Sequence, residues 1–181
     1  MCDNRSMAAG AIQIRSATTG DIDVIARIHV ETSRVTYASV FPPEHLATIT
    51  YERRQAAWRS IVADQELITL VAEKDGAVVG FASGGARREG PATYTGELHA
   101  VYLLPAQHRQ GLGKRLVATL MEALIARGHR SMLVWVLKDS PACGFYERLG
   151  GVTVASTTLT RAGRELEEVA YGWLDLSAAL P

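Results

Sequence analysis

The chain has 181 residues, of which 48% are hydrophobic and 21% are charged. This length and composition are typical of one compact domain with a full apolar core, and they exclude a chain that is disordered by default. Lys plus Arg and Asp plus Glu number 19 each, so no strong net charge attracts nucleic acid or an anionic membrane, and we expect neither as a partner.

The N-terminus and the cysteines bear on where the protein works. We expect residues 1–10 to be a flexible N-terminus and residues 11–181 to form a single domain. The sequence contains no signal-peptide core and no run of about 20 apolar residues that could span a membrane. Cys2 and Cys143 lack partners at the spacing of a metal or redox site. We therefore expect a cytoplasmic protein without a metal.

Residues 12–63 predict one strand followed by two helices. The alternating pattern that starts at Ile12 is typical of a half-buried strand, and the apolar spacing from Ile22 to His29 predicts a helix. After a break at Pro42, near-helical spacing of apolar residues predicts a single second helix over residues 43–63.

Three strands are expected next. Residues 67–74 and 77–86 are separated by Asp75-Gly76, a dipeptide that favours the positive φ values of a tight hairpin turn. A connection rich in Gly, Arg and Pro follows, and a third strand over residues 96–104 stops at Pro105. We expect these three strands to form an antiparallel meander.

The second half of the chain predicts two helices and three strands. The most regular helix begins at Gly111 and ends at Gly128, which stands in the C-cap position. The apolar run MLVWVL then predicts a central strand that is covered on both faces. A short helix over residues 141–149 follows, and strands near residues 152–160 and 167–174 complete the pattern.

The expected element order is therefore β-α-α-β-β-β-α-β-α-β-β. Such an order places a mixed, mostly antiparallel sheet between helices, which makes the chain an α/β protein with three α-β-α layers. No internal repeat, low-complexity tract or linker divides the sequence.

The segment from His108 to Lys114 has the composition of an anion-binding loop. It lies where a predicted strand ends and a predicted helix begins, so helical N–H groups and the helix dipole can face a pyrophosphate. Gly111 and Gly113 let the backbone approach phosphate oxygens, and Arg109 and Lys114 add positive charge. The structural alternative is a glycine turn that only caps a helix. A Rossmann or P-loop site is disfavoured, because no Gly-x-Gly-x-x-Gly opens an early βαβ unit.

This segment resembles the acetyl-CoA motif of the GCN5-related N-acetyltransferase superfamily, Arg/Gln-x-x-Gly-x-Gly/Ala, with His108 in the first position. The stretch DSPACGFYERLGG resembles the family's later cofactor segment, Asn-x-x-Ala-x-x-Phe-Tyr-x-x-x-Gly, with Asp139 in place of Asn and Ser140 beside it. The resemblance covers nearly the whole chain after residue 10. It implies the three-layer fold, acetyl-CoA as cosubstrate and transfer of acetyl to a primary amine.

The resemblance also implies which residues contact the cofactor. The strand before the loop would bond the pantetheine arm with its backbone, and the Val101 N–H would stabilise the thioester oxygen as it becomes negative. The predicted cofactor-binding residues are Val101, Tyr102, Leu103, Arg109, Gln110, Gly111, Leu112, Gly113, Lys114, Ser140, Ala142 and Phe145.

Two residues are the candidates for acid–base catalysis. Glu97 lies 14 positions before Gly111, the offset of the general base in the histone-acetyltransferase branch of the superfamily, and Tyr146 falls on its general-acid tyrosine. His99 would share a face with Glu97 in a regular strand, so it is an alternative base or relay. A salt-bridged Glu97 and a Tyr146 packed in the core are the structural alternatives.

The acceptor is less well defined by the sequence. The resemblance places it between the early helices and the last hairpin, and either a small molecule or a peptide could carry the amine. Five residues there, which could hold a cationic amine or simply be solvated, are Glu31, Tyr37, Glu44, Glu167 and Glu168. The leading function is direct acetyl transfer from acetyl-CoA to a primary amine, and the alternative is a non-catalytic acyl-CoA-binding module. A homodimer is left open.

Overall fold

A single seven-stranded sheet forms the middle layer of the protein. The computed structural model describes residues 12–180, and the expected flexible segment 1–10 lies outside the described residues. The strands are β1 (Ile12–Ser16), β2 (Ile68–Lys74), β3 (Ala77–Ala86), β4 (Gly96–Leu103), β5 (Met132–Leu137), β6 (Val152–Arg161) and β7 (Arg164–Trp173). Their order across the sheet is β1-β2-β3-β4-β5-β7-β6, and all neighbours are antiparallel except β4 and β5. The predicted α/β class with a mixed, mostly antiparallel sheet is confirmed.

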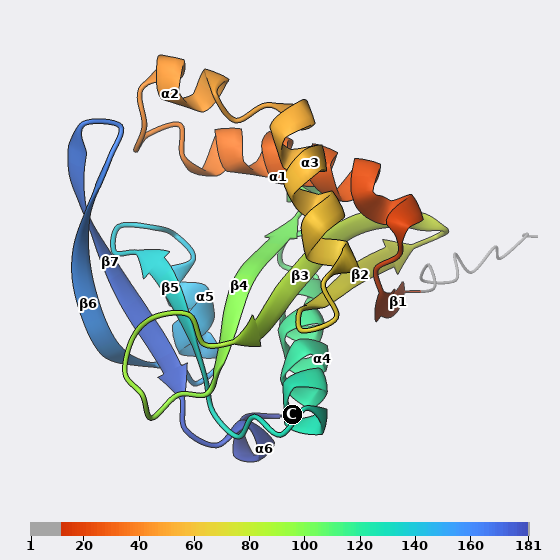
Figure 1. The fold of residues 1–181 in the computed structure, drawn as a ribbon, viewed down its shortest axis with the longest axis vertical. Helices are drawn as coiled ribbons and strands as arrows, with labels where there is room; N and C mark the ends of the chain where they lie inside the picture. The colour runs from red at the N-terminus through yellow and green to blue at the C-terminus, as the bar shows by residue number, and fades with distance from the viewer. Residues whose placement is uncertain (1–11, 181) are drawn as a thin grey trace, which may run out of the picture.

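Helices cover both faces of this sheet (Figure 1). They are α1 (Ile22–Thr36), α2 (Pro43–Ala47), α3 (Tyr51–Ala63), α4 (Leu112–Ala126), α5 (Cys143–Arg148) and α6 (Leu176–Ala179), with 3-10 turns η1 (Thr19–Asp21) and η2 (Pro105–Gln107). The core has two parts. One lies between the sheet and α4, around Leu116, Leu120 and Met132, and the other lies under α1 and α3, around Trp58 and Phe81.

Several predicted elements form where the local sequence signal is strong. The hairpin between β2 and β3 turns at Asp75 and Gly76, which both have positive φ, as the dipeptide predicts. The predicted helix after Gly111 is α4, and Gly128 beyond its end has φ +88°.

The prediction of one helix over residues 43–63 is wrong, because α2 and α3 are separate. The chain leaves helical geometry before α3, where the N-cap Thr50 side chain accepts a hydrogen bond from Arg53 N–H at 3.4 Å. At the C-terminal end, β7 begins at Arg164, earlier than expected, and α6 was not predicted. Asp175 caps α6 by accepting from Ser177 N–H at 2.9 Å.

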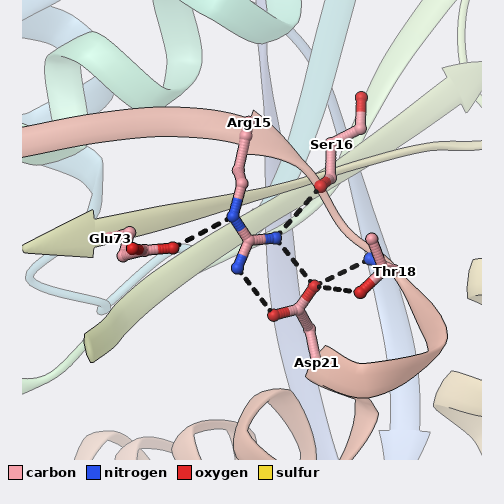
Figure 2. Close-up of polar contacts among 5 residues, drawn as sticks. All are labelled: Arg15, Ser16, Thr18, Asp21 and Glu73. Atoms are coloured by element: carbon pink, nitrogen blue, oxygen red, sulfur yellow. Dashed lines mark hydrogen bonds and ion pairs between the residues drawn. The ribbon is translucent and has the colours of Figure 1, made fainter. Parts of the chain in front are cut away.

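Arg15 ties β1 to the start of α1 (Figure 2). Its guanidinium donates to both carboxylate oxygens of Asp21, at 2.8 and 2.9 Å, and to Glu73 on β2 at 3.0 Å. Thr18 donates to the same Asp21 carboxylate through its N–H at 2.7 Å and its hydroxyl at 2.9 Å. These hydrogen bonds lower the pKa of the buried Asp21 to about 2, and the bonds from Arg15 contribute most.

Candidate functional site

The cofactor side of the site begins where two parallel strands part. β4 and β5 pair over Gly96–Glu97 alone in the part of the chain that the structure describes, and the rest of β4 pairs with β3. Leu104 N–H donates to Val79 O on β3 at 2.9 Å, and N–H groups alternate in direction along a strand. The N–H groups of Val101 and Leu103 therefore point into the gap between β4 and β5, as the predicted pantetheine contacts require.

The glycine loop leads into α4 with an open helix N-terminus. Gly111 is the N-cap, with φ +78°, and Arg109 before it has φ +60°. The first backbone bond of the helix runs from Arg115 N–H to Gly111 O at 3.1 Å, which leaves the N–H groups of residues 112–114 available to a ligand. Arg109 and Lys114 are exposed beside them. This arrangement fits a pyrophosphate, because the N–H groups and the helix dipole favour negative charge.

Several side chains of the loop are engaged with the protein itself. Leu112 is buried in the core, so only its backbone faces a ligand. The Gln110 amide donates to Ala106 O at 2.7 Å. The His108 ring donates from Nε2 to Leu103 O at 3.0 Å, since a carbonyl can only accept. The loop would therefore grip a cofactor mainly through backbone groups.

The start of α4 and the helix α5 are in contact through Gly113. A Cβ atom at Gly113 would lie 3.3 Å from Phe145 Cε2 and 3.4 Å from Leu103 Cδ1, so a side chain there would crowd both. Phe145 and Ala142 also pack against the core. The Ser140 hydroxyl accepts from Ala142 N–H at 3.2 Å and so supports the turn before α5. The two segments that resemble the family's cofactor motifs are thus brought together.

Tyr146, the predicted acid, lies on α5 with its side chain buried in the core. Its ring packs against Phe145 and Tyr171, with ring centres 5.3 and 6.0 Å away. Burial is the main cause that raises the pKa of its hydroxyl, and the nearby Tyr102 adds to this. Burial likewise raises the pKa of Tyr37 at the end of α1, with a further contribution from Tyr102. The pKa of the hydroxyl is thus raised at both Tyr146 and Tyr37, so both side chains are protonated at neutral pH.

Glu97, the predicted base, is buried on β4, with 2% of the residue exposed. Its carboxylate is not free. Oε2 accepts from the backbone N–H of Arg88 at 2.8 Å, and Oε1 accepts from Nε of the Arg88 guanidinium at 3.0 Å and from Nη2. Arg88 lies in the connection between β3 and β4, and no sequence motif pointed to it. The site thus contains a buried carboxylate that already binds a cationic group.

His99 lies beside this pair in an irregular part of β4. The register between β3 and β4 shifts between Ser83 and Gly84, which places His99 in a bulge, so the regular strand in which His99 would share a face with Glu97 is interrupted here. The ring donates from Nε2 to Ala86 O at 3.4 Å, which leaves Nδ1 as an acceptor. Burial, followed by the charge of Arg88, lowers the pKa of His99, so its ring is neutral at pH 7.

The acidic candidates for acceptor binding differ in their surroundings. Glu31 and Glu44 are exposed, and Glu167 forms an ion pair with Lys138 at 2.8 Å. Glu168 is half-buried on β7, opposite the end of β5. Burial raises the pKa of Glu168. Of the four, Glu168 alone is half-buried with a raised pKa in the described chain.

Two contacts enclose the side of the sheet where the resemblance predicts the acceptor. The hairpin of β6 and β7 reaches toward the segment between α1 and α2 (Figure 1), where the Arg164 guanidinium donates to Val40 O. The connection between β3 and β4 lies against β5, since a Cβ at Gly90 would be 3.3 Å from Trp135 Cζ2. The acceptor side is therefore built from elements that are far apart in the sequence.

His29 is a buried residue of this region to which sequence reasoning assigned no role. Its ring stacks on Tyr102, with centres 4.7 Å apart, and its Nδ1 accepts from Trp58 Nε1 at 3.1 Å. Burial lowers the pKa of His29 to about 3, so the ring is neutral at physiological pH. The His29 ring therefore packs against Tyr102 from the side of α1.

The fold and the site define a CoA-dependent acyltransferase, and the comparison with known proteins agrees. The model of the acetyltransferase (GNAT) family matches residues 30–151. The chain belongs to this family, and it is an acetyl-CoA-dependent N-acetyltransferase, as the loop and the later cofactor segment predicted. Among residues 12–180, no helix is both long and apolar enough to cross a membrane.

Three related proteins illustrate the match. The chain is 37% identical over 167 residues to YuaI of Bacillus subtilis, an uncharacterised N-acetyltransferase, covering 92% of this chain and 95% of that protein. It is 28% identical over 158 residues to phosphinothricin N-acetyltransferase of Streptomyces viridochromogenes, covering 84% and 79%. YncA from Salmonella typhimurium, solved with its cofactor acetyl-CoA, shares the fold with a TM-score of 0.67 at 24% identity, over 92% of this chain and 94% of that one.

Proposed function

We propose that the protein transfers acetyl directly from acetyl-CoA to a primary amine, with Glu97 as general base and Tyr146 as general acid. The observation that carries this proposal is the buried Glu97 carboxylate, which binds a cationic group where β4 and β5 part. A carboxylate in such a place attracts an ammonium group and can accept its proton.

The residues predicted to bind the cofactor suit an acetyl-CoA molecule that lies between β4 and β5. The N–H groups at the start of α4 would hold its pyrophosphate, and Arg109 and Lys114 would add charge. The open N–H groups of Val101 and Leu103 would bond the pantetheine arm and the thioester oxygen. Acetyl-CoA supplies the activated carbonyl carbon.

The chain's own groups move two protons in this mechanism. Glu97 removes one proton from the bound ammonium, which frees the nitrogen lone pair to attack the carbonyl carbon. The Val101 N–H stabilises the negative charge that grows on the oxygen. As the carbon–sulfur bond breaks, Tyr146 gives its hydroxyl proton to the thiolate, and the second proton of the amine later restores the tyrosine through solvent. Burial keeps Tyr146 protonated until then, because it raises the pKa of the hydroxyl.

A binding measurement and a transfer assay test this function. Calorimetry should show micromolar binding of acetyl-CoA and CoA, and thiol release should depend on a primary amine. Tyr146→Phe should lower kcat more than it weakens acetyl-CoA binding. Tyr171→Phe is the matched control, since the Tyr171 hydroxyl donates to Glu147 at 2.9 Å and has no assigned role in the reaction. A Tyr146→Phe variant with full kcat would remove the tyrosine from its assigned role.

A further inference from the structure

The two oxygens of the Glu97 carboxylate are held in different ways. Oε2 accepts from a backbone N–H, whereas Oε1 binds only the guanidinium of Arg88. The Glu97 side chain is 3% exposed, while the Arg88 side chain is 61% exposed. The guanidinium can therefore leave toward solvent while the backbone bond keeps the carboxylate in place.

A buried carboxylate needs a compensating positive charge, and two cations can supply it here. The guanidinium of Arg88 does so, but arginine cannot be deprotonated in proteins, so it can never hand a proton to Glu97. The ammonium group of an acceptor can do both. Once it has given up its proton, the buried ion pair becomes a neutral amine beside a neutral carboxyl group, which is the state that the reaction requires.

We propose that Arg88 is a specificity-determining residue that occupies the acceptor's cation subsite, so that a productive acceptor must displace its guanidinium from Glu97 Oε1. This inference rests on the proposed function. It also defines the substrate class. An alkyl primary amine, which is protonated in neutral water, can replace the guanidinium, whereas a weakly basic aryl amine, which is neutral there, cannot.

The neighbouring Arg87 shows that the two guanidinium groups have different tasks. Arg87 donates to Tyr94 O and to Gly90 O, both at 2.9 Å, and its backbone N–H donates to Thr95 O at 2.9 Å. These bonds fix the path of the β3–β4 connection from within, and Arg87 forms no ion pair in the described chain. Arg87→Met removes a neighbouring guanidinium that does not contact Glu97, so it controls for the loss of one positive charge and for any change in the path of the connection.

The first experiment detects the cation subsite without any turnover. Thermal unfolding is followed at pH 8 with increasing methylguanidinium chloride, and potassium chloride serves as the salt control. We expect a saturable rise in Tm for Arg88→Met that is absent from the wild type, from Arg87→Met and from the double variant Arg88→Met/Glu97→Gln. Arg88→Gln is the second variant, in case the methionine destabilises the fold. No saturable rise in either Arg88 variant would overturn the proposal.

The second experiment measures competition during turnover. With an alkyl primary amine as acceptor, Arg88→Met should lower KM by roughly tenfold, the change expected when the fraction of protein with a free cation subsite rises from about a tenth to one. An unchanged or raised KM together with a lower kcat would mean that Arg88 merely orients Glu97. If neither wild type nor variant releases thiol with any amine, the proposed function fails, and the Tm measurement still decides the role of Arg88.

Discussion

The clamp that joins β1 to the start of α1 consists of Arg15, Thr18, Asp21 and Glu73 (Figure 2). Replacing Asp21 with Asn tests how much this clamp contributes to stability. The folded-state pKa of this carboxyl lies near 2, below its ordinary 3.8, so the ionised form stabilises the folded protein. The relation between pKa and stability gives about 2 kcal/mol at neutral pH, and about 1 kcal/mol at pH 3. The contribution is complete above pH 4 to 5 and is lost as the pH falls through 2. Asp21→Asn should remove it at pH 7.

Urea unfolding at pH 7 and at pH 3 measures this effect. The difference in free energy of unfolding between wild type and Asp21→Asn should shrink by about half at the lower pH. Asp139→Asn is the matched control, because the Asp139 side chain is exposed and forms no ion pair in the described chain. The reasoning is refuted if the Asp21→Asn difference stays the same at both pH values, since the effect would then come from shape and not from charge.

Three further changes address the site and its surroundings. The free energy of unfolding of the wild type should fall by about 2 kcal/mol between pH 8 and pH 5, because His29 is protonated in the unfolded chain there but has a folded pKa of about 3. Urea unfolding of His29→Asn should show a weaker dependence of this free energy on pH. Gly111→Ala should weaken acetyl-CoA binding in calorimetry, with a strain of about 1 kcal/mol at φ +78°, whereas Gly128→Ala should only lower Tm. Glu97→Gln should reduce kcat/KM about 10²- to 10⁴-fold, and the decrease of kcat/KM at low pH should disappear from the pH profile. An unchanged pH profile would exclude Glu97 as the base.

The local geometry of the predicted cofactor segments could be predicted from the sequence because it depends on local signals. Gly111 needs a positive φ where a strand leads into a helix, and the glycine marks that position in the chain. Gly113 allows Phe145 to approach, and both residues belong to the segments that carry the family resemblance. Local sequence was less reliable at Thr48–Thr50, where a side-chain cap ends the apolar periodicity and divides the predicted helix in two.

The surroundings of the candidate base could not be predicted, because they depend on contacts between elements. The bulge at His99 results from the pairing of β4 with β3 and has no signature in the strand's own pattern. The bond between Arg88 and Glu97 requires the connection to fold back over its own strand. His29 and Tyr102 come from α1 and β4, so only the tertiary fold stacks their rings.

The contrast between the cofactor segments and the surroundings of Glu97 explains why a common acetyl donor, acetyl-CoA, does not determine which amine accepts the acetyl group. The backbone of β4 and the start of α4 form the cofactor side, and backbone groups are insensitive to most substitutions. Under the proposed function the acceptor side is formed by side chains such as Arg88 and Glu168, which lie on a loop and on a late strand. In this chain the cation that Glu97 holds is part of the protein. Acceptor choice then depends on whether an amine competes with Arg88, and a single substitution at that position should widen or shift the range of accepted amines while acetyl-CoA binding stays the same.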